Sequence, residues 1–186
     1  MTTAETATPA LELAGDYQID PAHTRIGFTA RHAMVTKVRG SFGEFRGSAH
    51  IDADPSKSWT EIVIATNSFT TGQEQRDGHV QGDDFLAVNV YPEITFRSTS
   101  VEQDGDVYNI TGDLTIRDTT RPVTIPFEFT GLAKDPFGNI RAGFEGSTTI
   151  NRKDWGITFN AALETGGVLV SEKVGLEFDV SAIKQA

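Results

Sequence analysis

The chain has 186 residues, no Cys, and 26 acidic against 16 basic residues, which gives a formal net charge of −10. This length corresponds to about one domain, and a composition of 38% hydrophobic and 23% charged residues is typical of a globular protein. The excess of carboxylates argues against nucleic-acid binding and against electrostatic docking of the chain on anionic membranes. The absence of Cys excludes disulfides, thiolate catalysis and cysteine zinc sites.

The first fourteen residues contain no Lys or Arg and no continuous apolar run. A secretory signal needs both features, so we expect a flexible tail over 1–14 and a cytoplasmic protein. The folded domain is then expected over 15–186. No stretch approaches the ~20 apolar residues of a membrane span.

Strict alternation of apolar and polar residues dominates the chain after Gly15. Within 123–130, for example, Val123, Ile125, Phe127 and Phe129 share one face of a predicted strand. Turn sequences at 54–56, 104–106 and 135–139 separate such segments, which predicts antiparallel hairpins and an all-β barrel or sandwich. Alternation stops between 71 and 89, where we expect a short helix or lid near 73–88.

Small residues such as Gly112 and Ala142 occur in phase with bulky apolar ones on the predicted inward rows. They leave space for an internal apolar cavity, or they relieve crowding at strand bends around a filled core. The pattern leaves both alternatives open. If a cavity exists, its candidate ligand-binding residues are the apolar side chains of these rows: Phe28, Phe96, Leu114, Ile125, Phe127, Phe144, Leu176 and Phe178.

The four histidines, His23, His32, His50 and His79, have no metal-site spacing, so no metal or cofactor is predicted. His32 is in phase with an inward row near a strand end. It is interpreted as a core histidine, as a polar contact of a pocket, or as the catalytic residue of a small hydrolase or isomerase. No nucleophile elbow and no glycine-rich phosphate loop occurs in the sequence.

Two arginines are candidates for the mouth of a cavity. Arg152 follows the strand ending at Ile150, and Arg76 lies in the irregular segment. An Arg at the mouth of an apolar cavity holds an anionic head group while the hydrocarbon tail stays inside. The alternative for each is a surface salt bridge with one of the many acids.

Several segments resemble the YceI-like, or polyisoprenoid-binding, domain family, in the family's order. They are residues 15–28, 38–47, 76–79, 84–86, 91–96, 112–116, 120–123 and 149–157. The resemblance covers nearly the whole chain. It implies an extended, lipocalin-like antiparallel barrel of about eight strands that binds a long-chain isoprenoid, isoprenoid quinone or fatty-acid-like amphiphile in its interior.

The resemblance implies no catalytic activity, and the expected partner is a hydrophobic small molecule. Nucleic acid and stable membrane insertion are not expected, and a homodimer stays open. Matching motif positions, together with the phase of the strands, suggest head-group or mouth contacts at His23, Arg76, His79 and Arg152, with His32 on the cavity wall. A structural, stress-related module with a filled barrel is the remaining alternative.

Overall fold

The computed structural model describes residues 12–186. Residues 1–11 of the predicted tail lie outside the described part, whereas Leu13 accepts a 2.7 Å hydrogen bond from the Tyr17 hydroxyl. The strands are β1 (Gly15–Ile19), β2 (Arg25–His32), β3 (Thr36–Phe42), β4 (Phe45–Ile51), β5 (Trp59–Ala65), β6 (Phe69–Thr70), β7 (Glu93–Asp104), β8 (Val107–Ile116), β9 (Thr119–Lys134), β10 (Ile140–Asn151) and β11 (Lys173–Lys184). Short 3₁₀ helices cover Pro21–His23, Pro55–Lys57, Thr66–Ser68 and Arg152–Trp155.

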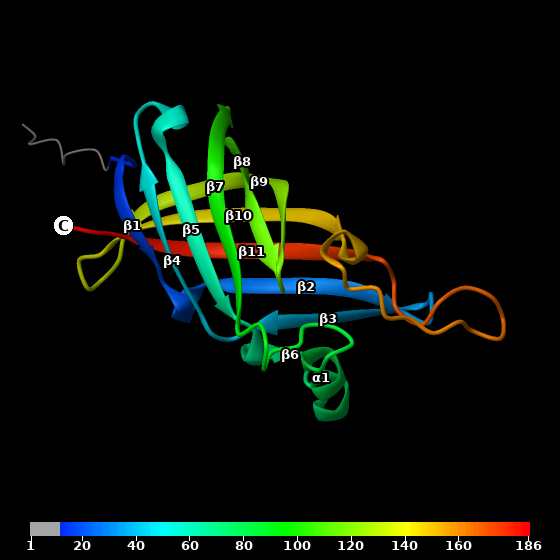
Figure 1. The fold of residues 1–186 in the computed structure, drawn as a ribbon. Coiled ribbons are helices and arrows are strands. Elements are labelled where there is room, and N and C mark those ends of the chain that lie inside the picture. The colour runs from blue at the N-terminus through cyan, green and yellow to red at the C-terminus, as the bar shows by residue number, and fades with distance from the viewer. Residues whose placement is uncertain (1–11) are drawn as a thin grey trace, which may run out of the picture.

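Eight strands close into an antiparallel barrel, which confirms the predicted fold class. Their order is β1-β4-β5-β7-β8-β9-β10-β11, and the ring closes because β1 also pairs with β11. β2 follows β1 after Pro21–His23 and pairs with the other half of β11, and β3 pairs with β2 before the chain turns into β4. The β2–β3 hairpin therefore prolongs the barrel at one end (Figure 1).

The glycines of the inward rows make room for aromatic rings of the neighbouring strands and do not leave voids. A Cβ on Gly112 would lie 2.5 Å from Cζ of Phe96, and one on Gly146 would lie 2.7 Å from Cδ1 of Phe127. The Phe ring of the neighbouring strand thus lies over each glycine, and only a residue without a side chain admits it.

A bulge in β7 changes the phase of the predicted inward row. The register with β8 shifts between Ser98 and Ser100, after which Val101 rather than an even-numbered residue faces the interior. Val101 is 5% exposed. Strict alternation from Ile94 places it outside, so the sequence pattern holds only up to the bulge.

The irregular segment contains the helix α1 (Glu74–Gln81), which confirms the predicted short helix. The Gln73 side chain caps it by accepting a hydrogen bond from the main-chain N–H of Arg76. The Asp77 carboxylate accepts bonds from the main chain and hydroxyl of Thr71 and so ties the helix to the preceding turn. These contacts hold α1 beside β6, at the end where β2 and β3 project (Figure 1). No helix of residues 12–186 is long and apolar enough to cross a membrane.

Candidate functional site

The interior of the barrel encloses a cavity of about 850 Å³. This volume lies near the upper limit of the roughly 300–1,000 Å³ that small-molecule pockets occupy. The small residues of the inward rows allowed either an internal cavity or a filled core, and the structure contains the cavity. Its wall is apolar and aromatic over most of its length, with Phe28 stacked on Phe69 at a ring-centroid distance of 4.7 Å.

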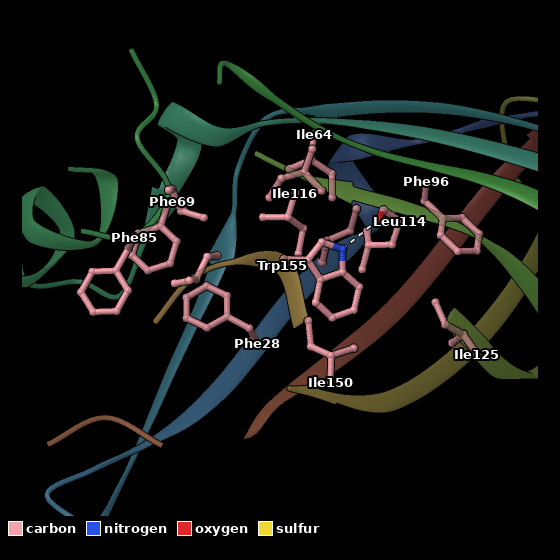
Figure 2. Close-up of a cluster of buried hydrophobic side chains, with 14 of the residues drawn as sticks. Phe28, Ile64, Phe69, Phe85, Phe96, Leu114, Ile116, Ile125, Ile150 and Trp155 are labelled. Carbon is pink, nitrogen blue, oxygen red and sulfur yellow. Dashed lines mark hydrogen bonds between the residues drawn. The ribbon is translucent and has the colours of Figure 1, made fainter. Parts of the chain in front are cut away.

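The structure places all the predicted apolar candidates on this wall: Phe28, Phe96, Leu114, Ile125, Phe127, Phe144, Leu176 and Phe178. Figure 2 shows several of them converging on the interior from different strands, together with residues such as Ile64 and Ile116. They meet because antiparallel strands with matched registers turn the same alternate residues inward. Their contact with a ligand stays a prediction.

One end of the cavity opens between the β2–β3 hairpin, α1 and the segment 157–171. Several polar lining residues there are exposed to solvent, namely Arg31, His32, Thr36, Gln73, Gln75 and His79. The predicted mouth residues Arg76 and His79 lie at this end. His32 lines the cavity as an exposed residue at the end of β2, so its interpretation as a core histidine is wrong.

The charge of the lining differs from that of the chain. The lining residues include Arg31, Arg76 and Arg152 and three histidines, but no Asp or Glu. The chain as a whole has a net charge of −10. The described cavity is therefore free of carboxylates although the surface is rich in them.

Arg76 is held at the opening by the turn before α1. Its Nε donates to Oγ1 of Thr71 at 2.7 Å and its Nη2 donates to the main-chain oxygen of Thr71 at 3.3 Å. Neither contact neutralises the guanidinium, which is half-buried beside the cavity. This arrangement leaves a positive charge at the opening of the cavity.

His79 closes part of the same opening with its ring. Nε2 lies 3.0 Å from the Asp84 carboxylate, and the ring meets the edges of Phe85 and Phe159 at centroid distances of 5.2 and 5.1 Å. The imidazole thus joins a polar rim to the aromatic wall beneath it.

Arg152 lies on the wall but is used for structure rather than exposed at the mouth. It is 5% exposed, and its Nε, Nη1 and Nη2 donate to the main-chain oxygens of Ser171, Ile157 and Val170 at 2.9, 2.8 and 3.2 Å. Burial lowers the pKa of the guanidinium. The three bonds fasten the segment 157–171 over the cavity, so three of the five N–H groups of Arg152 serve to support the opening.

His23 does not reach the cavity. It lies in the 3₁₀ helix after β1, where Nδ1 is 2.7 Å from Asp20 and the side chain is 65% exposed. The family motif that includes it shapes a strand junction here. His23 lies outside the alternating rows, and the cavity lining does not include it.

At the other end of the cavity lies a histidine, His50, that no sequence pattern indicates as a wall residue. His50 lines the cavity together with Trp59, and its ring is stacked on the indole at a centroid distance of 6.4 Å. Its Nδ1 is 2.7 Å from Asp16 and its Nε2 is 3.4 Å from Asp52. Hydrogen bonds first to Asp16 and then to Asp52 raise the pKa of His50.

Further wall residues come from irregular segments that show no alternation. Phe85 and Leu86 follow α1, and Phe159, Leu169 and Val170 belong to the segment 157–171. The only signal for them in the sequence is that large apolar residues occur in otherwise polar loops. Among residues 12–186, no group of three or more His, Asp or Glu side chains is arranged to hold a metal ion.

Comparisons with known proteins agree with this architecture. A family model described as YceI-like domain matches residues 17–182. A UPF0312 protein of Pseudomonas paraeruginosa is 39% identical over 181 residues, covering 96% of this chain and 92% of the relative. Among solved structures, BcnA of Burkholderia cenocepacia superposes with a TM-score of 0.77 at 24% identity, covering 88% of this chain and 98% of that one.

A polyisoprenoid binding domain from Saccharophagus degradans superposes with a TM-score of 0.68 at 15% identity. This alignment covers 91% of this chain and 98% of that domain. At such identities the two structural comparisons establish a shared fold.

Proposed function

Because the chain belongs to the YceI-like domain family and encloses a large apolar cavity, we propose that it binds a long-chain isoprenoid or similar amphiphilic lipid without chemical conversion. The observation that carries the proposal is the composition of the cavity wall. Aliphatic and aromatic side chains surround about 850 Å³, and polar groups gather at its ends. A solved neighbour described as a polyisoprenoid binding domain supports the same class of ligand.

The energy available from such a wall is sufficient for useful affinity. Each buried methylene contributes about 0.8 kcal/mol, so ten of them contribute roughly 8 kcal/mol before the costs of association are subtracted. A micromolar dissociation constant corresponds to about 8.2 kcal/mol. Tight binding therefore requires a chain longer than ten carbons.

The polar groups indicate the orientation and the head group of the ligand. Arg76 and Arg31 lie at the α1 end, and no carboxylate faces the described cavity. An anionic or neutral head group at this end is therefore favoured over a cationic one, because the charged residues of the lining are arginines.

The same composition supports binding rather than catalysis. His32, the catalytic candidate, has no carboxylate partner among the described residues, whereas His50 and His79 are paired with Asp16 and Asp84. General acid–base chemistry at His32 would depend on such a partner to orient the imidazole. A barrel that served only as a structural module would gain stability by filling this volume, because empty apolar space destabilises a core.

The direct test is organic extraction of the purified protein followed by mass spectrometry, together with uptake of an added isoprenoid quinone. We expect a co-purified lipid or saturable uptake. A protein that carries no lipid and takes up no isoprenoid quinone or isoprenyl phosphate would contradict the proposal.

Head-group preference is tested with an isoprenyl alcohol, phosphate and amine of one chain length. We expect the amine to bind most weakly. Arg76→Gln should weaken the phosphate and leave the alcohol nearly unchanged, because only a charged head group depends on the guanidinium. Equal weakening of the alcohol and the phosphate would instead mean that Arg76 acts through the shape of the opening.

A further inference from the structure

The turn of the β2–β3 hairpin exposes two apolar side chains at the open end of the cavity. Met34 is 60% exposed and Val35 is 76% exposed. The hairpin projects from the barrel on the same side as the segment 157–171 (Figure 1). Arg31, His32 and Thr36 flank this turn and line the cavity, so the exposed apolar tip and the opening adjoin each other.

The backbone of this turn is strained. Ala33 and Met34 have φ values of 51° and 66°, in the left-handed region that favours Gly and Asn. The loop Ala33–Val35 is closed by a hydrogen bond from the main-chain N–H of Val35 to the oxygen of His32, and two successive positive φ values in such a turn are normally adopted by Asn-Gly. Here the chain instead places a large apolar side chain in the strained position and exposes it to water. Strain of this kind is typically retained where a site needs it.

The hairpin also differs in charge from the rest of the chain. Residues 21–43 contain four basic residues and no Asp or Glu, so all 26 acidic residues lie elsewhere. Arg31 lies directly opposite Lys37 across the strand pair, and Arg39 lies opposite Thr29 on the same face. Like charges in opposing positions destabilise a hairpin. None of the ion pairs among residues 12–186 includes these three cations.

We propose that the β2–β3 tip, formed by Ala33–Val35 with Arg31, Lys37 and Arg39, docks on an anionic lipid bilayer, where the cavity exchanges its ligand. Met34 and Val35 enter the interface while the cations contact head groups. The role of ligand exchange rests on the proposed function, whereas docking does not.

The charge distribution of the chain fits this orientation. The net charge of −10 argues against docking of the whole surface, but every acidic residue lies outside residues 21–43, so the hairpin itself has only positive formal charge. The neighbouring segment 157–171 contributes one acid, Glu164, and places Gly167 against Met34 without covering its side chain.

The test is co-sedimentation with vesicles of phosphatidylcholine, alone or mixed with phosphatidylglycerol. We expect binding to the mixed vesicles only, with weakening as salt is added. Lys37→Gln combined with Arg39→Gln should lower partitioning by roughly thirtyfold, at about a fivefold loss for each basic residue. The matched control, Arg121→Gln with Lys134→Gln, makes the same charge change on β9 and should bind as the unchanged protein does.

A second variant separates docking from folding. Ala33→Asn with Met34→Gly supplies the turn sequence that the backbone favours, so its melting temperature should stay equal or rise. Vesicle binding should nevertheless fall by about tenfold because Met34 no longer inserts. Since neither residue lines the cavity, the lipid recovered by extraction should not change.

Three results would overturn the proposal: no binding to mixed vesicles, equal binding to both vesicle types, or equal losses in the control and hairpin pairs. A fourth result would also count against it: the Lys37, Arg39 variant aggregates while the turn variant still binds vesicles. In that case the cations protect a strand edge from aggregation instead of contacting head groups. A protein that docks but carries no lipid would refute the proposed function alone. One that carries lipid and does not dock would refute this inference alone.

Discussion

The indole N–H of Trp155 donates a hydrogen bond of 2.9 Å to the main-chain oxygen of Leu114, and both side chains are buried (Figure 2). The bond lies near the place where β9 and β10 separate. The described pairs between β9 and β10 begin at Phe127. Before that residue, β9 is paired with β8 on one side, and no pair with β10 is described. Trp155, in the 3₁₀ helix that follows β10, closes this part of the wall.

Replacing Trp155 therefore tests how the barrel is closed. Trp155→Phe keeps most of the ring but leaves the Leu114 oxygen without its donor, so we expect a loss of about 1–3 kcal/mol in the free energy of unfolding. Trp155→Ala adds a void and should cost about 3–5 kcal/mol. Urea denaturation monitored by circular dichroism measures both. A cost below about 0.5 kcal/mol for the alanine variant would show that this part of the wall closes without the indole.

Arg152 stabilises the segment 157–171 through three main-chain oxygens, and its guanidinium lies 5.9 Å from the centre of the Phe85 ring. Arg152→Ala removes the donors from one buried and two part-buried acceptors and should cost about 3 kcal/mol. Arg152→Lys keeps the charge but not the planar fork, so we expect an intermediate loss.

Limited proteolysis under native conditions shows where the loss occurs. We expect cleavage between 157 and 171 to accelerate in both Arg152 variants, and more in the alanine variant. Lys153→Ala, which removes the neighbouring exposed ion pair with Glu172, is the control and should change little. Unchanged cleavage in Arg152→Ala would mean that other contacts hold the segment.

Phe144 allows the cavity wall to be tested against the outer surface of the same strand. Its half-buried ring lines the cavity and meets the Tyr108 ring at a centroid distance of 5.9 Å. Phe144→Arg introduces an unpaired charge into an apolar site, so we expect uptake of an isoprenoid quinone to fall at least tenfold.

Ser147→Arg is the matched control, because Ser147 is exposed on the opposite face of β10 and the charge change is the same. Uptake by this variant should equal that of the unchanged protein. Equal uptake by both variants, with cooperative unfolding retained, would show that the Phe144 part of the cavity does not hold the ligand.

The sequence predicts the barrel well where strands are regular. Inward rows such as that of Ile125 and Phe127 follow from period-two alternation alone, because one face of each strand must be buried. The pattern fails at Val101, since a bulge adds a residue without leaving a signal in the alternation.

The sequence predicts the site less completely than the fold. Phe85 and Phe159 lie in segments without regular structure, so no periodicity identifies them as wall residues. Arg152 was expected to face a head group because it follows an inward row, but the chain turns into a 3₁₀ helix there and main-chain oxygens surround it. Which partner an Arg finds is decided by tertiary contacts, and local sequence does not reveal them.

A pH-dependent contribution to stability is expected from Arg141, which joins two carboxylates far apart in sequence. Nη1 lies 2.7 Å from Asp20 and Nε lies 2.8 Å from Asp135. Hydrogen bonds from Arg141 and then His23 lower the pKa of Asp20 from 3.8 to about 2. Burial opposes the shift at Asp135, but bonds from Arg141, Asn139 and Phe137 outweigh it and lower that pKa to about 2 as well.

Both carboxylates are more acidic in the folded chain, so the unfolded chain binds more protons as the pH falls. Their contribution to stability is therefore complete above about pH 5 and is lost progressively between about pH 4 and pH 2. Arg141→Gln should destabilise the protein near neutral pH and flatten the acid limb of a plot of unfolding free energy against pH. Arg121→Gln, which changes an exposed Arg on β9, should leave that limb unchanged. An acid limb of equal slope in the Arg141 variant would assign the acid sensitivity to other carboxylates.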